Sequence, residues 1–274
     1  SPGDALRTLP FIVVCRIARC PFLVQFHKDL ITVLGGRPLV KRLAIGLWNN
    51  AQGLVFLSHS LAEEGQHDFA LDPRLCHVIP NGLEPGWLGL ERKPLADRRQ
   101  DVVFVGRWQA EKGVHDLATV LAPDWLGQRL TCHVYGSAPG QPLEANIRFH
   151  GWCGPDELAE ALSDAKLLIL PSYAEAYPTV LLEAAATGTP FVATSIAGIP
   201  DIVTQSGGGR SFRPGDTQGL AAAVEALLSD PEAWETASKA AHAWAQQQGA
   251  ERFATQWQRL LDGASTRGTG TRAN

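Results

Sequence analysis

Residues 166–195 read KLLILPSYAEAYPTVLLEAAATGTPFVATS, and the order of their apolar runs decides the fold class. A strand pattern at 166–172 leads into a helical pattern over 179–187, and a second strand pattern follows at 190–195. The Gly-Thr-Pro run at 188–190 ends the helix, since glycine accommodates the backbone beyond a helix and proline cannot continue it. A strand, a helix and a strand in this order predict a parallel α/β sheet.

The same alternation extends over the second half of the chain, from residue 101 onward. Strand patterns lie at 101–106, 129–136, 146–151, 166–172, 190–195 and near Phe212. Helical patterns lie at 113–122, 155–165, 179–187, 217–229 and from 231 to 262. Such an alternation predicts a Rossmann-like domain over 96–262.

The first part of the chain has the same kind of pattern with fewer strands. Helical patterns at 4–19 and 38–50, a run Ser-Leu-Ala-Glu at 60–63 that predicts a capping box, and strands at 21–28, 53–58 and 76–80 can be recognised. We therefore expect an incomplete Rossmann-like domain over 1–95, with its boundary in the Pro-, Gly- and charge-rich stretch 84–100. The small polar residues of 263–274 predict a disordered tail.

Composition argues against nucleic-acid-binding, metal-binding and membrane-spanning proteins. The 274 residues carry a formal net charge of −4, which disfavours nucleic acid as a partner. Five scattered cysteines without a C-x-x-C pair, and no metal-ligand spacing, fit reduced thiols and predict no metal site. Without a membrane-spanning run or a secretory signal, a cytoplasmic location is expected. The chain contains no methionine, so we expect its start to have been cut, processed or omitted.

Two cations follow the first strand of the second domain. In FVGRWQAEKG the strand ends at Gly106, and Arg107 and Lys112 lie in the loop that enters the next helix. Ligands of parallel sheets bind at the carboxyl ends of strands, and a helix N-terminus with two cations suits a diphosphate. The alternative is an ordinary solvated pair in a surface loop.

Two carboxylates flank the start of the helix in PSYAEAYPTVLLE. Glu175 precedes the helix and Glu183 lies among apolar residues inside it, while Pro178 suits the first turn. The N–H groups of Thr179 and Val180 would then be available to an anion. A sugar nucleotide has a hydroxyl cluster on either side of its diphosphate, so it matches this arrangement. The alternatives are that Glu183 is an acid on a solvated helix face and that Glu175 is an ordinary polar residue of a turn.

These motifs together resemble a known family. The patterns G-R-x4-K-G and E-x7-E, followed by ATGTPFVATSIAGIPDIV, are similar to the retaining glycosyltransferases of family 4, which have the GT-B fold. VFLSHSLAEE and VIPNGL support the resemblance, which covers about residues 21–262. The family fold is two Rossmann-like parallel-sheet domains that face a cleft.

The resemblance implies a role for each candidate residue. Arg107 and Lys112 would hold the donor diphosphate, Glu183 the ribose hydroxyls and Glu175 the sugar hydroxyls. His27, at a strand end, would lie beside the reacting sugar, although a lone histidine there is often structural. Catalysis is assigned to His27, Arg107, Lys112 and Glu175. The donor-binding set implied is Gly106, Arg107, Lys112, Gly136, Trp152, Glu175, Ala176, Tyr177, Pro178, Thr179, Val180 and Glu183.

The implied activity is metal-independent transfer of a sugar from a UDP- or GDP-sugar, without a further cofactor, to a hydroxyl of a glycan, lipid-linked or small-molecule acceptor, with retention of configuration. The front of the chain departs from the family, because no leading strand or Gly-Gly turn precedes His27. A fragment of an active enzyme and a non-catalytic nucleotide-sugar-binding module therefore both stay open. An epimerase or phosphorylase is a third, weaker option.

Contact with a membrane is a separate hypothesis. Arg37, Lys41 and Arg42 stand beside apolar residues such as Leu39, and such a helix could touch anionic lipid at the inner face of a membrane. An ordinary domain helix is the favoured interpretation.

Overall fold

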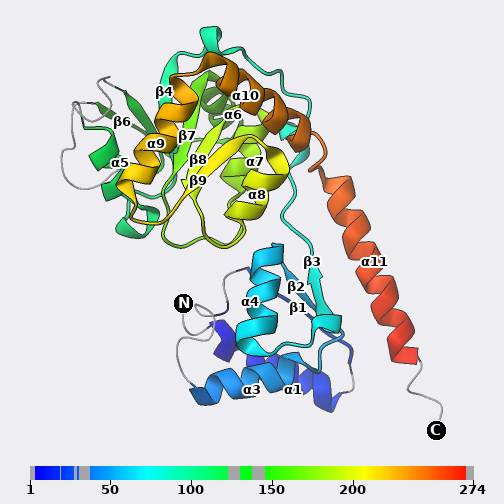
Figure 1. The fold of residues 1–274 in the computed structure, drawn as a ribbon. Helices are drawn as coiled ribbons and strands as arrows, with labels where there is room; N and C mark the ends of the chain where they lie inside the picture. Colours follow the sequence, from blue (N-terminus) through cyan, green and yellow to red (C-terminus); the bar gives the residue numbers. More distant parts are fainter. Residues whose placement is uncertain are drawn as a thin grey trace. The chain divides into compact units, whose positions relative to one another are not determined.

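The structure is a computed structural model that describes residues 4–18, 20–27, 30, 38–122, 130–137 and 146–269. The chain forms two compact units (Figure 1). The first comprises the residues up to 81, the short segment 175–177 and the residues from 251 onward. The second comprises 82–174 and 178–250.

The second unit is built on a six-stranded sheet in which every neighbouring pair is parallel. The strand order is β6-β5-β4-β7-β8-β9. The strands are β4 (Gln100–Val105), β5 (Cys132–Tyr135), β6 (Ile147–Gly151), β7 (Ala165–Leu170), β8 (Phe191–Thr194) and β9 (Gly209–Phe212). All six strand predictions are confirmed, although residue 129 of the second lies outside the described residues.

Helices cover both faces of this sheet (Figure 1). They are α5 (Val114–Val120), α6 (Pro155–Asp164), α7 (Thr179–Ala186), α8 (Ile199–Ser206), α9 (Thr217–Leu228) and α10 (Pro231–Ala245). Helices α5 and α9 share one apolar core with the strands, while α6, α7 and α8 pack on the opposite face. Parallel strands need such crossover helices, which bury both faces and explain the continuous apolar runs of the strands.

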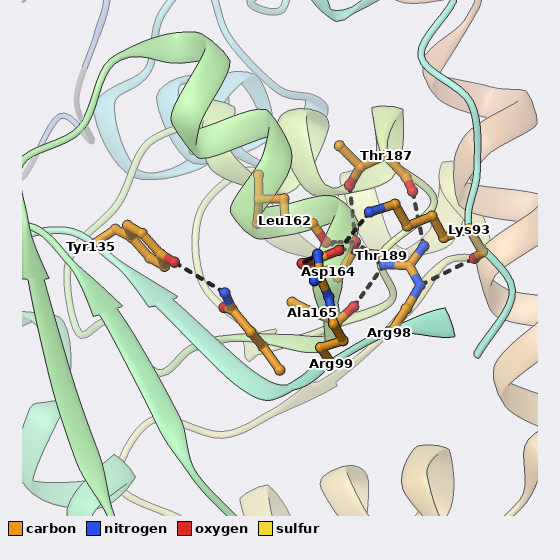
Figure 2. A network of polar contacts seen from close by, with 10 residues as sticks. Lys93, Arg98, Arg99, Tyr135, Leu162, Asp164, Ala165, Thr187 and Thr189 are labelled. Atoms are coloured by element: carbon orange, nitrogen blue, oxygen red, sulfur yellow. Dashed lines mark hydrogen bonds and ion pairs between the residues drawn. The ribbon is translucent and has the colours of Figure 1, made fainter. Parts of the chain in front are cut away.

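A buried arginine joins three segments beside the amino end of the sheet (Figure 2). Arg98 is 3% exposed, and its guanidinium donates to the carbonyls of Ala165 at 2.7 Å and of Thr187 and Gly188 at 3.0 Å. It also donates to the Thr189 hydroxyl at 2.6 Å. Burial lowers the pKa of Arg98 to about 10, but the guanidinium stays charged at neutral pH. Arg98 therefore links the start of β4 to the start of β7 and to the turn after α7.

The first unit has a three-stranded parallel sheet in the order β1-β2-β3. Its strands are β1 (Leu23–Gln25), β2 (Gly53–Phe56) and β3 (Cys76–Val78), and its helices are α1 (Asp4–Ile17), α3 (Pro38–Trp48), α4 (His59–Phe69) and, from the end of the chain, α11 (Ala250–Thr269). Phe253, Trp257 and Leu260 of α11 pack with Val55 and Ile79 beside the sheet. These helices and strands confirm the predicted pattern of the first part.

Helix α11 extends into the segment that was predicted to be a disordered tail. The small polar residues 263–274 were expected to be disordered, yet the helix continues to Thr269, and residues 270–274 lie outside the described residues. Its apolar contacts with β2 and the residue after β3 anchor it in the first unit, and serine, threonine and glycine can extend a helix that is already anchored. The predicted helix over 231–262 is also divided, because α10 ends at Ala245 and α11 starts at Ala250.

Three smaller expectations differ from the structure. The start of α4 is capped by Ser58, whose hydroxyl accepts from the Leu61 N–H at 3.2 Å, so the capping box predicted at 60–63 is wrong by two residues. The compact units divide after Asn81, ahead of the boundary expected in 84–100. The predicted helical patterns did not include α8, which begins at Ile199 with Pro200 in its first turn.

All five cysteines are free thiols. Among the described residues no helix has the length and apolar character that a bilayer crossing requires. Within the same residues, no three histidine, cysteine or acidic side chains gather as metal ligands would.

Candidate active site

The strand order of the second unit creates a topological switch point. From β4 the chain proceeds outward through β5 to β6, then crosses back to β7 on the other side of β4 and proceeds outward through β8 to β9. The connections that leave β4 and β7 therefore run in opposite directions from one place on the carboxyl edge. In open α/β sheets, ligands bind in the crevice that forms there.

The loop after β4 carries the two predicted cations. Arg107 is exposed, and its Nη2 lies 3.1 Å from Oε1 of Glu111 in an ion pair whose side chains are 53% and 54% exposed. Lys112 closes a short 3-10 turn, Ala110–Lys112, directly before α5. An exposed ion pair of this kind contributes little free energy, so a phosphate group could replace Glu111 as the partner of Arg107.

The loop after β7 lies against the loop after β4. The Tyr173 N–H donates to the Glu111 carbonyl at 2.8 Å. Gly113 has φ +68°, and a Cβ atom at this position would stand 1.9 Å from the carbonyl oxygen of Pro171. Only glycine allows both this backbone conformation and this approach. The structure thus brings together the cation-bearing loop and the segment that enters α7.

Helix α7 contributes its N-terminus and one acid. Pro178 is the N-cap, and within the described part of the chain no side chain caps the helix. Thr179 is exposed and Val180 half-buried at the first turn. Glu183 is half-buried one turn further on, and burial raises the pKa of its carboxyl above the ordinary 4.5, while a hydrogen bond from Thr179 opposes the shift.

Glycines line the same edge beside β4. The Gly106 N–H donates to the Tyr135 carbonyl at 2.9 Å, and the Gly136 N–H donates to the Gly151 carbonyl at 2.8 Å. A Cβ at position 136 would lie 1.9 Å from the carbonyl oxygen of Gly106. Trp152 follows β6, and its side chain is 71% exposed, so it is not part of the core. The loop beyond residue 137 lies outside the described residues.

The remaining predicted residues can be placed individually. His27 is exposed just beyond β1, in the first unit. Glu175 and Ala176 are half-buried and Tyr177 is buried, in the segment that leads to Pro178. Their assignment to a donor site is a prediction for which the local geometry gives no direct test.

Sequence reasoning missed three residues of this edge. The Glu111 side chain pairs with Arg107, and the Glu111 carbonyl accepts from the N–H of Tyr173 in the loop after β7. Ser172 is fully buried, and its hydroxyl lacks a hydrogen-bond partner within the described segments. The position of Ser172 and Tyr173 close to the end of a strand was visible in the sequence. Which loops meet was not, because it depends on the strand order.

Comparison with known proteins identifies this part of the chain. Residues 99–230, which contain the switch point and both loops, match the sequence profile of the glycosyl transferases group 1 family. This segment belongs to the glycosyl transferases group 1 family.

Curated relatives extend the match beyond this glycosyl transferases group 1 segment. Glycogen synthase of Mycobacterium tuberculosis is 32% identical over 224 residues, which cover 72% of this chain and 51% of the relative. D-inositol 3-phosphate glycosyltransferase of Geodermatophilus obscurus is 30% identical over 232 residues, which cover 74% and 52%. The chain thus spans about half the length of the curated relatives it matches.

Solved structures agree on the fold. Sucrose-phosphate synthase from Thermosynechococcus elongatus has a TM-score of 0.75 at 22% identity, over 93% of this chain and 71% of its own. HepE from Anabaena in complex with UDP-glucose also has a TM-score of 0.75 at 22% identity, over 95% and 76%. The fold is α/β with two parallel sheets, and these structural neighbours are GT-B glycosyltransferases.

Proposed function

We propose that the protein is a glycosyltransferase that moves a sugar from a UDP- or GDP-sugar to an acceptor hydroxyl with retention of anomeric configuration. The observation that carries the proposal is the meeting of two loops at the switch point. The loop after β4 bears Arg107 and Lys112, and the loop after β7 leads into the uncapped N-terminus of α7. Solved neighbours that bind UDP and UDP-glucose support a nucleotide-sugar donor.

The reaction requires charge stabilisation at the leaving group. As the bond between the anomeric carbon and the diphosphate breaks, positive charge grows on the sugar ring and negative charge on the phosphate. Arg107, Lys112 and the N–H groups at the start of α7 would bind that phosphate. In this assignment no divalent metal is needed, because fixed cations and dipoles supply the positive field.

Hydroxyl recognition is assigned to the two acids. Glu183 would accept hydrogen bonds from the ribose hydroxyls and Glu175 from those of the sugar. A carboxylate held among apolar neighbours carries a desolvation cost, and a hydrogen-bonding ligand would offset it. Gly106 and Gly136 allow close approach of the backbone, and Trp152 would lie beside the base. His27 would approach the reacting sugar.

A second candidate is a module that binds nucleotide sugars without turnover. It uses the same donor residues, and within the described residues the first unit has a sheet of three strands against six in the second. Acceptor recognition in this family is expected from the first domain, so a change in that domain would affect turnover before donor binding.

A panel of ligands tests the proposal and separates the two candidates. Thermal unfolding is measured with UDP, GDP and their sugars. A ligand at a hundred times its dissociation constant should stabilise the protein by about 2.7 kcal/mol. Release of nucleotide from the bound sugar donor supports the enzyme, and binding without release supports the module. Absence of stabilisation by every nucleotide in the panel would refute both.

The acceptor class and membrane contact stay predictions. In α3, Lys41 Nζ donates to the Asp68 carbonyl at 3.2 Å and lies 4.2 Å from the centre of the Phe69 ring, as expected of an ordinary domain helix. Leu39 of the same helix is 80% exposed, as a lipid-contacting helix would require. Arg37 lies outside the described residues. Co-sedimentation with anionic vesicles would decide between a peripheral and a purely cytoplasmic protein.

A further inference from the structure

Tyr173 holds the loop after β7 by both its backbone and its side chain. Its N–H donates to the Glu111 carbonyl at 2.8 Å, and its hydroxyl donates to Oδ2 of Asp116 on α5 at 2.6 Å. Both partners belong to the segment that follows β4. A hydrogen bond from a hydroxyl to a carboxylate is among the stronger kinds in proteins.

The surroundings of Tyr173 restrict where its ring can lie. The side chain is 48% exposed, so it is not held by burial in the core. On its other side is the turn before α9, where Gly215 has φ +78° and a Cβ atom would lie 3.3 Å from the Tyr173 hydroxyl oxygen. The hydrogen bond to Asp116 also raises the pKa of Tyr173 above its ordinary value of 10, so the hydroxyl keeps its proton at neutral pH.

The loop that Tyr173 holds has no regular secondary structure of its own. Residues 171–178 form neither helix nor strand between β7 and α7. The backbone of Pro171 approaches Gly113 at the start of the loop, and near its end the buried Tyr177 accepts at its carbonyl from Asn81 Nδ2 at 3.3 Å. Glu175 stands between these fixed points, two residues after Tyr173. A further bond at Tyr173 narrows the positions that the Glu175 carboxylate can take.

We propose that Tyr173 is a positioning residue whose hydroxyl bond to Asp116 fixes the loop after β7 and so places Glu175 for contact with the sugar of the donor. The inference rests on the proposed function, since it concerns the same site. Tyr173 itself touches neither the diphosphate nor the sugar in this arrangement. Removing its hydroxyl should therefore weaken recognition of the sugar and leave recognition of the nucleoside diphosphate largely intact.

Two variants and one matched control test the proposal. Tyr173→Phe removes the hydroxyl and keeps the ring, while Asp116→Asn keeps an acceptor oxygen. The control is Tyr135→Phe, because the Tyr135 hydroxyl is also hydrogen-bonded, to Nε2 of Gln100 at 3.2 Å, but lies on β5 away from this loop. Hydrogen exchange of residues 171–178 and calorimetric affinities for UDP and UDP-glucose are measured in each, or for the GDP pair if the panel selects guanine.

The expected result is specific to the loop and to the sugar. Tyr173→Phe should speed exchange in 171–178 by about tenfold and reduce affinity for UDP-glucose relative to UDP by about tenfold. Asp116→Asn should stay within about threefold of the wild type, and Tyr135→Phe should match it. Unchanged exchange in Tyr173→Phe would overturn the proposal, as would an equal loss of affinity for UDP and UDP-glucose.

Failure of the proposed function would be recognised separately. If the wild-type protein binds no nucleotide, the proposed function fails, and the placement of Glu175 for a sugar fails with it. The exchange measurement still decides whether Tyr173 fixes the loop. If the wild type binds UDP and UDP-glucose equally well, the donor site stands, but the role of Glu175 and Tyr173 in holding the sugar is refuted.

Discussion

Replacing Arg98 by alanine should destabilise the second unit strongly, because the arginine is the donor for several buried acceptors. The Gly188 carbonyl also receives the Ser238 hydroxyl, so it keeps a partner when Arg98 is removed. The carbonyls of Ala165 and Thr187 lose the guanidinium that lies at 2.7 and 3.0 Å. A buried acceptor that loses its donor costs about 1–3 kcal/mol.

The contact between Arg98 and the Trp234 ring, 4.9 Å from the ring centre, adds about 1 kcal/mol when it is lost. Alanine also removes a charged guanidinium that is costly to bury, and this gain offsets part of the lost contacts. We therefore expect the free energy of unfolding to fall by about 3 kcal/mol in total. For a domain of this size each kcal/mol lowers the melting temperature by about 2–4 °C. The expected shift is therefore about 6–12 °C, measured by thermal unfolding in circular dichroism.

Arg99→Ala is the control, because Arg99 is the next residue along the chain and its side chain is exposed whereas that of Arg98 is buried. Its side chain is 73% exposed and its Nη2 pairs with Oδ2 of Asp164 at 2.5 Å. Asp164 is buried but keeps Lys93 Nζ as a second partner at 2.5 Å, so loss of the exposed Arg99 should cost about 1 kcal/mol. Melting temperatures of Arg98→Ala and Arg99→Ala that agree within about 2 °C would refute the reasoning about buried acceptors.

Three further predictions concern the carboxyl edge. Arg107→Ala or Lys112→Ala should lower donor turnover about a hundredfold, corresponding to about 2–4 kcal/mol of lost charge stabilisation, and near-normal rates in steady-state assays would contradict the assignment. Gly113→Ala should lower the free energy of unfolding, measured in urea, by about 3 kcal/mol or more, because its Cβ would stand 1.9 Å from a carbonyl oxygen. The control Gly89→Ala has φ +78° but open space around it, and it should lower the same free energy by about 1 kcal/mol. Equal losses in the two variants would argue against the steric cause. Because the pKa of Glu183 is raised above 4.5, nucleotide affinity should fall as pH decreases through that raised value. Glu183→Gln should flatten the dependence of the calorimetric affinity on pH. If this dependence is unchanged in the variant, Glu183 is excluded from the ribose site.

Burial of Glu183 affects the stability of the ligand-free protein in the opposite direction: the free energy of unfolding is expected to decrease, not increase, as pH rises. A carboxyl whose folded-state pKa is raised contributes stability below the unfolded value of 4.5, and this contribution is lost as pH increases through the raised value. Glu183→Gln should therefore stabilise the free protein at neutral pH more than at pH 4. The same residue is then costly for folding and useful for binding, as expected of a ligand-binding acid.

Local pattern was sufficient to predict the strands and most helices of the second unit. Strands β4, β5, β7 and β8 are short, mainly apolar runs beside a turn signal, β6 alternates between apolar and polar residues, and neither signal depends on distant contacts. Helix α8 of this unit was missed. In the first unit the end of α11 was also not predicted, because its last residues are poor helix formers that continue an anchored helix. Ser58 was passed over as a cap because a stronger-looking capping box stood two residues later.

The candidate site could be predicted only in part. Arg107, Lys112 and Glu183 were found because they follow strand ends or interrupt apolar runs. Glu111 and Tyr173 were not, since their importance arises from contacts between segments that are distant in the sequence. Tyr173, for example, is 57 residues from its partner Asp116 on α5. Such contacts follow from the strand order, which the sequence pattern alone leaves open. The charged stretch around Arg98 was read as a linker for the same reason.

The position of α11 has a consequence for synthesis on the ribosome. Its apolar residues complete a core whose other members, Val55 and Ile79, are translated far earlier. The first unit therefore cannot finish folding until α11 has been made, whereas every strand of the six-stranded sheet is available before then. We expect the later-encoded unit to mature first during translation, and nascent chains that stop before α11 to expose the unfinished core to chaperones and proteases.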